Sequence, residues 1–221
     1  MPVAKKAVIC FTRVPRPGKT KTRLLPLLSG EDCARIHTAF LLDLAAVYNA
    51  MEADLFVAYA PDPDPTLLET VFPSASLVFP QMGDNLGDRM DNAIRYVLSR
   101  GYDACLLTGS DLPLLGKEHL VSGFAALESA DVVIGPTGDG GYYLVGMKEP
   151  CSPIFDYRDY GTATVLDSTL AAAEAAGRRV AFAMPCDDVD TPADLRLLCE
   201  KLPSHSHTAQ FLNQLRREGI L

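Results

Sequence analysis

Short apolar segments, separated by turns rich in glycine and proline, recur along the chain and predict the strands of a buried sheet. The central segment runs from Ala104 to Thr108 and is followed directly by Gly109. An apolar run without polar alternation is typical of a strand buried on both faces of a parallel sheet. The same pattern predicts further strands at 3–11, 53–60, 77–79, 131–135, 142–147 and 179–184.

Apolar residues three or four positions apart predict helices between these strands. The clearest stripe lies within 31–51 and comprises Cys33, Ile36, Phe40, Leu44, Val47 and Met51. His37 lies beside this stripe, and we interpret it as a packing or surface residue. Other helices are expected to begin near Leu86 and Thr191 and to span 116–127, 164–176 and 207–218. The alternation of strands and helices predicts an α/β fold.

The composition fits one globular domain and narrows the classes of partner. The chain has 221 residues, of which 48% are hydrophobic and 22% are charged, so it can fill one core. Its formal net charge of −8 argues against a nucleic-acid duplex or an anionic membrane as partner. We find no run long enough for a membrane span and no signal peptide, and we expect a cytoplasmic protein. Six cysteines without a C-x-x-C pair are interpreted as buried free thiols.

A basic segment follows the first predicted strand. Residues 12–24 contain two prolines and a glycine, which predict a loop, and five cations: Arg13, Arg16, Lys19, Lys21 and Arg23. A solvated basic loop is one interpretation, because charge runs are often only that. The position favours a second interpretation, since ligands bind at the carboxyl ends of strands in open α/β sheets. There, Lys and Arg side chains would hold phosphates and stabilise developing negative charge.

Acidic residues also follow predicted strands farther along the chain. Asp111 follows the central strand, where a lone carboxylate suits a hard divalent cation that carries phosphates, although an aspartate in a turn is the alternative. Thr191 to Asp194 form a helix cap, which leaves Asp188 and Asp190 upstream as spare carboxylates. Capping likewise explains Asn85 and Asp88 but gives no reason for Arg89.

A glycine-rich turn lies between two predicted strands. It contains Gly138, Asp139, Gly140 and Gly141, which is more glycine than a plain connection needs. Glycine permits close approach of the backbone to a ligand. We therefore expect Gly140 and Gly141 to pass close to the ligand, with Asp139 oriented toward the transferred group.

Taken in order, these motifs resemble the nucleotide-diphospho-sugar transferase superfamily with its GT-A fold over nearly the whole chain. The motifs are Pro17-Gly18-Lys19, Lys21-Thr22-Arg23-Leu24, Leu86-Gly87-Asp88-Arg89, Gly109-Ser110-Asp111-Leu112-Pro113, Gly135-Pro136, Asp139-Gly140-Gly141-Tyr142-Tyr143 and Asp188-Val189-Asp190-Thr191-Pro192. The most similar family is the rSAM/selenodomain-associated transferase 1 family, often labelled as glycosyltransferases. The loop also resembles that of the phospholactate guanylyltransferases.

The resemblance implies a single-domain, Rossmann-like fold with a mixed, mostly parallel sheet and helices on both faces. It implies a nucleotide-binding half at about 1–115, an acceptor-side half at about 116–202 and a C-terminal helix at 207–218. It also implies Mg²⁺ or Mn²⁺ on Asp111, with Asp190 or Asp188 as a second carboxylate. The catalytic candidates are Arg23, Lys21 and Asp139. The candidate nucleotide- and phosphate-binding residues are Thr12, Arg13, Gly18, Lys19, Lys21, Arg23, Arg89, Gly109, Ser110, Gly140 and Gly141.

Three functions follow from this pattern. The first is a metal-dependent glycosyltransferase that acts on a nucleotide-activated sugar and a small-molecule acceptor. The second is a nucleotidyltransferase that moves a nucleoside monophosphate from a triphosphate to a phosphorylated acceptor and releases pyrophosphate. The third is a nucleotide-binding module without catalysis. The family labelling favours the first function, which is our prediction, while the cation-rich loop favours the second, which is the alternative together with the third. The chain lacks both the Gly-x-Gly-Thr-Arg loop of pyrophosphorylases and an Asp-x-Asp at 109–111, so the exact reaction stays open, as does the oligomeric state.

Overall fold

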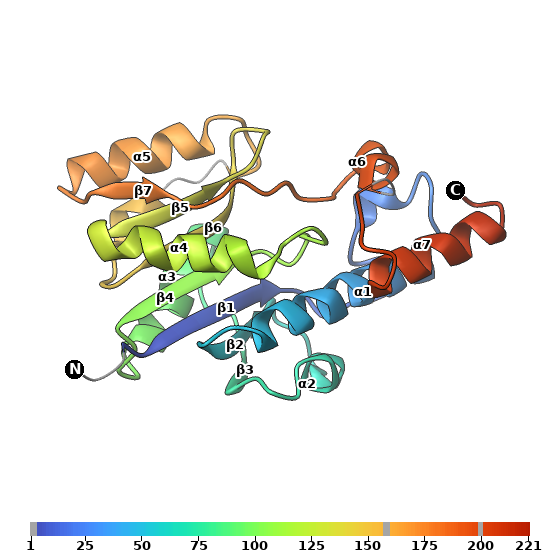
Figure 1. The fold of residues 1–221 in the computed structure, drawn as a ribbon, viewed down its shortest axis with the longest axis horizontal. Coiled ribbons are helices and arrows are strands. Elements are labelled where there is room, and N and C mark those ends of the chain that lie inside the picture. Colours follow the sequence, from blue (N-terminus) through green and yellow to red (C-terminus); the bar gives the residue numbers. More distant parts are fainter. Residues whose placement is uncertain (1–3, 157–159, 199–200) are drawn as a thin grey trace.

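The computed structural model describes residues 4–156, 160–198 and 201–221. In this part of the chain, seven strands form one sheet in the order β3-β2-β1-β4-β6-β5-β7 (Figure 1). The strands are β1 (Lys6–Thr12), β2 (Asp54–Tyr59), β3 (Leu77–Pro80), β4 (Ala104–Thr108), β5 (Val132–Pro136), β6 (Tyr142–Met147) and β7 (Val180–Phe182). Each predicted strand is present, with ends shifted by a few residues.

The sheet is parallel except at β6. Strand β1 pairs in parallel with both β2 and β4, whereas β6 runs antiparallel to β4 and β5. The chain builds outward from β1 to β3 and then returns to place β4 on the other side of β1. This reversal makes the gap beyond the carboxyl ends of β1 and β4 a topological switch point, where open α/β sheets bind ligands. The predicted mixed, mostly parallel α/β fold is confirmed.

Helices cover both faces of the sheet (Figure 1). They are α1 (Gly30–Asn49), α2 (Thr66–Val71), α3 (Leu86–Leu98), α4 (Lys117–Ser129), α5 (Val165–Ala175), α6 (Pro192–Leu198) and α7 (His207–Arg217), with short 3₁₀ turns η1 (Thr22–Leu24) and η2 (Ser152–Phe155). Helices α1, α2 and α4 pack on one face, while α3, α5 and η2 pack on the other.

The two faces of β1 show how the sequence pattern separates these cores. Val8 and Cys10 join the cluster under α1 and α4, whereas Ala7 and Ile9 join the cluster under α3. All four side chains are at most 1% exposed. Alternate residues of a strand point to opposite faces, so a continuous apolar run is what a strand needs when helices cover both sides.

A third apolar cluster lies beyond the sheet, where α6 and α7 pack beside α1 (Figure 1). Leu24 of η1 is fully buried in this cluster with Phe40 of α1 and Leu215 of α7. The cluster therefore anchors the end of the basic segment to α1, and this fixes the residues just before Leu24.

Two local features were not predicted. Helix α2 follows the Pro-Asp-Pro-Asp-Pro segment at 61–65, and the sequence analysis gave no helix between the strands at 53–60 and 77–79. The predicted loop at 12–24 ends in the 3₁₀ turn η1, because Leu24 is drawn into the third cluster. Five cysteines are buried free thiols, as expected, and Cys199 lies outside the described residues. In the parts that the structure covers, helices of the length and hydropathy of a membrane span are absent.

The C-terminal helix depends on one carboxylate of α1. Asp43 accepts hydrogen bonds from the backbone N–H groups of His207 and Thr208, at 2.8 and 3.0 Å, and from the Thr208 hydroxyl at 2.6 Å. Ser206 accepts from the next free N–H, that of Ala209.

We predict that Asp43→Ala lowers the free energy of unfolding by about 1–2 kcal/mol, because two first-turn donors lose their acceptor. Chemical denaturation measures this, with exposed Ala46→Ser on the same helix as control. An equal loss in both variants would show that Asp43 does not cap α7.

Candidate functional site

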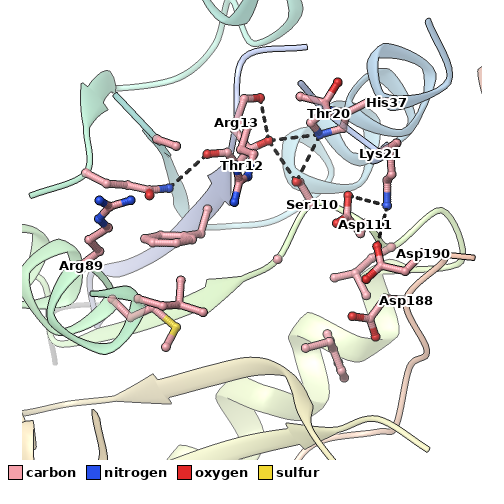
Figure 2. Close-up of a pocket in the computed structure, with 18 of the residues that line it drawn as sticks. Thr12, Arg13, Thr20, Lys21, His37, Arg89, Ser110, Asp111, Asp188 and Asp190 are labelled. Atoms are coloured by element: carbon pink, nitrogen blue, oxygen red, sulfur yellow. Dashed lines mark hydrogen bonds and ion pairs between the residues drawn. The ribbon is translucent and has the colours of Figure 1, made fainter. Parts of the chain in front are cut away.

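A cavity of about 420 Å³ opens beyond the carboxyl ends of β1 and β4 (Figure 2). Its floor is apolar, with Phe11, Leu107 and Val145 among its residues, and its walls carry charged side chains. Figure 2 shows Arg89 toward one end and Asp188 and Asp190 toward the other. Because β1 and β4 are parallel neighbours in register, Thr12 at the end of β1 lies beside Ser110, two residues after β4.

The two strand ends are joined by a buried hydroxyl pair. Thr12 Oγ1 donates to Ser110 Oγ at 2.9 Å, and His37 Nε2 lies 3.4 Å from each of these oxygens. All three side chains are buried. The predicted binding residues Thr12 and Ser110 thus lie in one cluster, and His37 from α1 completes it.

His37 was interpreted as a packing or surface residue; the structure shows it buried, which agrees with a packing role, and it also lines the cavity. Burial lowers its pKa to about 4, with smaller effects from Asp111, Lys21 and Arg13. Its Nδ1 has no hydrogen-bond partner among the described residues. The imidazole is therefore neutral at pH 7. The signal in the sequence was its place beside, rather than on, the apolar stripe of α1.

Gln81 is a second residue that the sequence analysis missed. It follows β3, is buried, and lines the cavity. Its Nε2 donates to the carbonyls of Thr12 and Ala58, both at 3.0 Å, and so ties the end of β1 to β2. Its position after a strand, at the edge where Asp111 also lies, was the available signal.

Lys21 and two aspartates form the charged centre of the site. Lys21 Nζ lies 2.7 Å from Asp111 Oδ1 and 3.2 Å from Asp190 Oδ1, and it donates to the Val189 carbonyl at 2.7 Å (Figure 2). The Lys21 side chain is only 3% exposed. Burial raises the pKa of Asp111, but the charge and hydrogen bond of Lys21 outweigh this, and the pKa lies below its ordinary value.

Local structure brings these three residues together. Lys21 has φ 50° and ψ 38°, and it is the one non-glycine residue with positive φ in the described ranges. Asp190 is held through its backbone, because its N–H donates to Asp194 Oδ2 within the predicted cap of α6. Arg23 lies in η1, two residues after Lys21. Its guanidinium approaches Asp190 Oδ2 at 3.3 Å, yet its side chain is 70% exposed. Its guanidinium is available to a ligand.

Asp188 lies beside Asp190 (Figure 2). Burial, and after it the charges of Asp190, Asp139 and Asp111, raise the pKa of Asp188 to about 6. The predicted group Asp111, Asp188 and Asp190 is therefore brought to one end of the cavity, where mutual repulsion favours a bound cation.

The other predicted phosphate-binding residues are placed as follows. Arg13, Lys19, Arg89 and Gly109 line the cavity with Lys21 and Arg23. Gly18 has φ +69° and packs near Gly30 at the start of α1, so it shapes the loop. Arg89 Nε donates to the Gly83 carbonyl at 3.0 Å. Arg16, by contrast, pairs with Asp62 at 2.8 Å, which explains this cation without a ligand.

Asp139 lies in a second cavity of about 650 Å³ that adjoins the first. The two cavities share Arg23, Asp188 and Asp190 among their lining residues. Asp139 Oδ1 accepts from Thr137 Oγ1 at 2.5 Å and from the Gly141 N–H at 3.1 Å, and the Thr137 bond lowers its pKa. The second cavity is thus placed to receive a molecule next to the charged centre.

Gly140 has a packing role in the structure. It has φ +87°, and a Cβ atom there would collide with the carbonyl oxygen of Ala163. Of the described residues, those that line the two cavities do not include Gly140 or Gly141. Contact of these glycines with a ligand stays a prediction.

The charge of the first cavity differs in sign from that of the whole chain. Among its described lining residues, five are Lys or Arg and three are Asp, whereas the protein carries a net charge of −8. Such a concentration of positive charge in an acidic protein, at a switch point of the sheet, is typical of an anion site.

A family model matches residues 27–162, a range that contains Arg89, Asp111 and Asp139. The chain belongs to the family described as "Uncharacterized protein conserved in bacteria (DUF2064)". A solved structure from Desulfovibrio desulfuricans G20, provisionally named a nucleotide-diphospho-sugar transferase, is 30% identical with a TM-score of 0.90. The alignment covers 97% of this chain and 96% of that one. These findings confirm the resemblance to the superfamily.

Two further proteins extend the comparison. The 2-phospho-L-lactate guanylyltransferase of Methanothermobacter thermautotrophicus is 29% identical over 129 residues, which is 58% of this chain; the match spans about half, 56%, of that curated relative. The solved structure of 4-diphosphocytidyl-2C-methyl-D-erythritol synthase from Anaerococcus prevotii has a TM-score of 0.58 at 11% identity. The alignment covers 95% of this chain and 96% of that chain. The second likeness shows a shared fold alone.

The donor set fits a divalent cation that is held partly by phosphates. Among the described residues, no group of three or more His, Cys, Asp or Glu side chains could hold a metal ion on its own. Mg²⁺, however, is usually bound by one or two carboxylates, with substrate phosphates and water as its other ligands. Asp111 and Asp190 already surround one cationic nitrogen, that of Lys21, so their oxygens can surround a metal ion.

Protonation of His37 should destabilise the fold at low pH. Its folded pKa of about 4 lies below the unfolded value of about 6.5, so only the unfolded state binds the proton between these values. The free energy of unfolding therefore falls as pH drops from 6.5 to 4, by about 3 kcal/mol from this group. We predict that His37→Gln loses less stability than the wild type across this window, as measured by denaturation at each pH. Exposed His205→Gln is the control, and identical pH profiles for wild type and His37→Gln would contradict the account.

Proposed function

We propose that the protein is a nucleotidyltransferase that binds a nucleoside triphosphate with Mg²⁺ or Mn²⁺ in the cavity beyond β1 and β4. Its phosphates would lie against Lys19, Lys21 and Arg23, and its acceptor in the adjoining cavity beside Asp139. The homologous guanylyltransferase supports transfer of a nucleotide. The division into a nucleotide-binding and an acceptor-side half stays part of this proposal.

The charge of the cavity favours a nucleoside triphosphate over a nucleotide-sugar as the ligand. Five cationic side chains face three carboxylates, and a divalent cation would add two more positive charges. This sum matches the charge of a fully ionised triphosphate better than that of the diphosphate in a nucleotide-sugar. Preorganised cations of this kind stabilise the charge that develops on the leaving pyrophosphate.

The residues of this chain have separate tasks in the proposed reaction. Asp111 and Asp190, with Asp188 as the alternative, would hold the metal ion, which would supply charge neutralisation at the phosphates when bound. Arg23, with its exposed guanidinium, would contact the phosphate oxygens. The shared border of the two cavities would bring an acceptor oxygen in line with the α-phosphorus.

Transfer of a sugar from a nucleotide-diphospho-sugar is the second candidate. It is supported by the 30% identity and 0.90 TM-score to the Desulfovibrio protein. The two reactions share the nucleotide site and differ in the bond that breaks. Nucleotidyl transfer releases pyrophosphate, whereas sugar transfer releases a nucleoside diphosphate.

Product analysis separates these reactions. A thermal-shift screen of nucleoside triphosphates and nucleotide-sugars, with Mg²⁺ or Mn²⁺, first identifies the bound nucleotide, because binding to the native state raises its melting temperature. The selected nucleotide is then incubated with phosphorylated and hydroxylic acceptors. We predict pyrophosphate release in step with acceptor modification. Release of a nucleoside diphosphate would favour the second candidate, and binding without turnover would favour a non-catalytic module.

Arg23→Ala tests whether Arg23 binds the phosphates of the nucleotide. The side chain is exposed and pairs only loosely with Asp190, so the variant should fold normally. We predict that affinity for the triphosphate falls about tenfold or more, while affinity for the corresponding nucleoside is unchanged, because a charge-assisted contact is lost. Calorimetry measures both affinities. Lys117→Ala, at the exposed start of α4, is the control, and an equal loss for nucleoside and triphosphate would show that Arg23 supports the fold instead.

A further inference from the structure

The Lys21 ammonium already fills the place that the proposed function gives to a divalent cation. Its three N–H donors face three acceptors: Asp111 Oδ1, Asp190 Oδ1 and the Val189 carbonyl. An ammonium group has three donors, so it is saturated by protein groups. Its nitrogen also lies 5.2 Å from the centre of the Phe40 ring, which favours a cation at this point.

The surrounding chain keeps the ammonium in this place. The Lys21 side chain is 3% exposed, whereas those of Asp111 and Asp190 are 38% and 37% exposed. The carboxylates are therefore much more exposed than the ammonium that they contact. Lys21 has a left-handed backbone immediately before η1, and its side chain contacts both carboxylates.

We infer that Lys21 and the divalent cation compete for Asp111 and Asp190, and that Lys21 leaves them only when phosphates offer it replacement acceptors. This inference rests on the metal site of the proposed function. Two cations cannot share both carboxylate oxygens at such distances without strong repulsion. The metal and the nucleotide phosphates must therefore bind together, and Lys21 suppresses metal binding to the protein alone.

Lys21 and its neighbour Lys19 differ in their surroundings. Both are cations of the same loop and both line the cavity. Lys19 is exposed, whereas Lys21 is buried against the carboxylates. Removal of either charge changes the net charge equally, but only removal of Lys21 vacates the carboxylates. Lys19 is thus a matched control.

The test is a titration with Mn²⁺ in the absence of nucleotide, in which free Mn²⁺ is measured by electron paramagnetic resonance. We expect Lys21→Met to bind Mn²⁺ at least about tenfold more tightly than the wild type, because a charge in direct contact with both ligands is removed. Lys19→Met should change the affinity far less. Equal Mn²⁺ affinity in wild type and Lys21→Met, or an equal gain in both variants, would overturn the inference.

Folding of the variant is controlled with a second substitution. Lys21→Gln retains an N–H donor for the Val189 carbonyl and should show the same gain in Mn²⁺ affinity. If both variants fold only when Mn²⁺ is added, the metal replaces the ammonium, as inferred. If neither folds even with Mn²⁺, the ammonium is a permanent part of the fold and the inference is wrong. Nucleotide binding by the wild type in the presence of Mn²⁺ tests the proposed nucleotide site separately, so the two failures can be told apart.

Discussion

The ion pairs of Lys21 with Asp111 and Asp190 are the interaction on which the site depends. They join three segments that are distant in the sequence: the loop after β1, the end of β4 and the segment before α6. The Val189 N–H also donates to the Asp111 carbonyl at 2.9 Å, which ties the last two segments together. The buried ammonium of Lys21 is stable only while its partners stay in place, because an unpaired buried charge is costly. The cavity is therefore bounded by groups that constrain one another.

The fold places these groups at the one point where such a cluster can meet a ligand. The strand order reverses beside β1, so helices cover both faces but leave the ends of β1 and β4 open. The third apolar cluster holds Leu24 and the α6 region against α1, and this brings the basic loop and Asp190 to the same opening. An acidic chain thereby presents a local excess of positive charge to a phosphorylated ligand.

Much of this arrangement could be predicted from the sequence. Uninterrupted apolar runs required strands covered on both faces, and residues that follow such runs had to meet at one edge of the sheet. That reasoning placed Thr12, Ser110 and Asp111 together. It could not show that Lys21 would be buried against Asp190, because the third cluster and the cap of α6 create this contact through tertiary packing. Nor could it reveal His37 or Gln81, whose roles arise from hydrogen bonds between distant segments.

We propose that the carboxylates and cations beyond β1 and β4 bind the phosphates of a nucleotide together with a divalent cation. A crystal structure with Mn²⁺ and a non-hydrolysable nucleoside triphosphate, with the metal located by its anomalous scattering, tests this most directly. We expect a Mn²⁺ peak coordinated by Asp111 and at least one phosphate oxygen, with Arg23 in contact with the phosphates and Lys21 moved from Asp111 toward them. A triphosphate bound outside this cavity, or bound within it while Lys21 still bridges Asp111 and Asp190, would show that these groups do not bind phosphates and metal together.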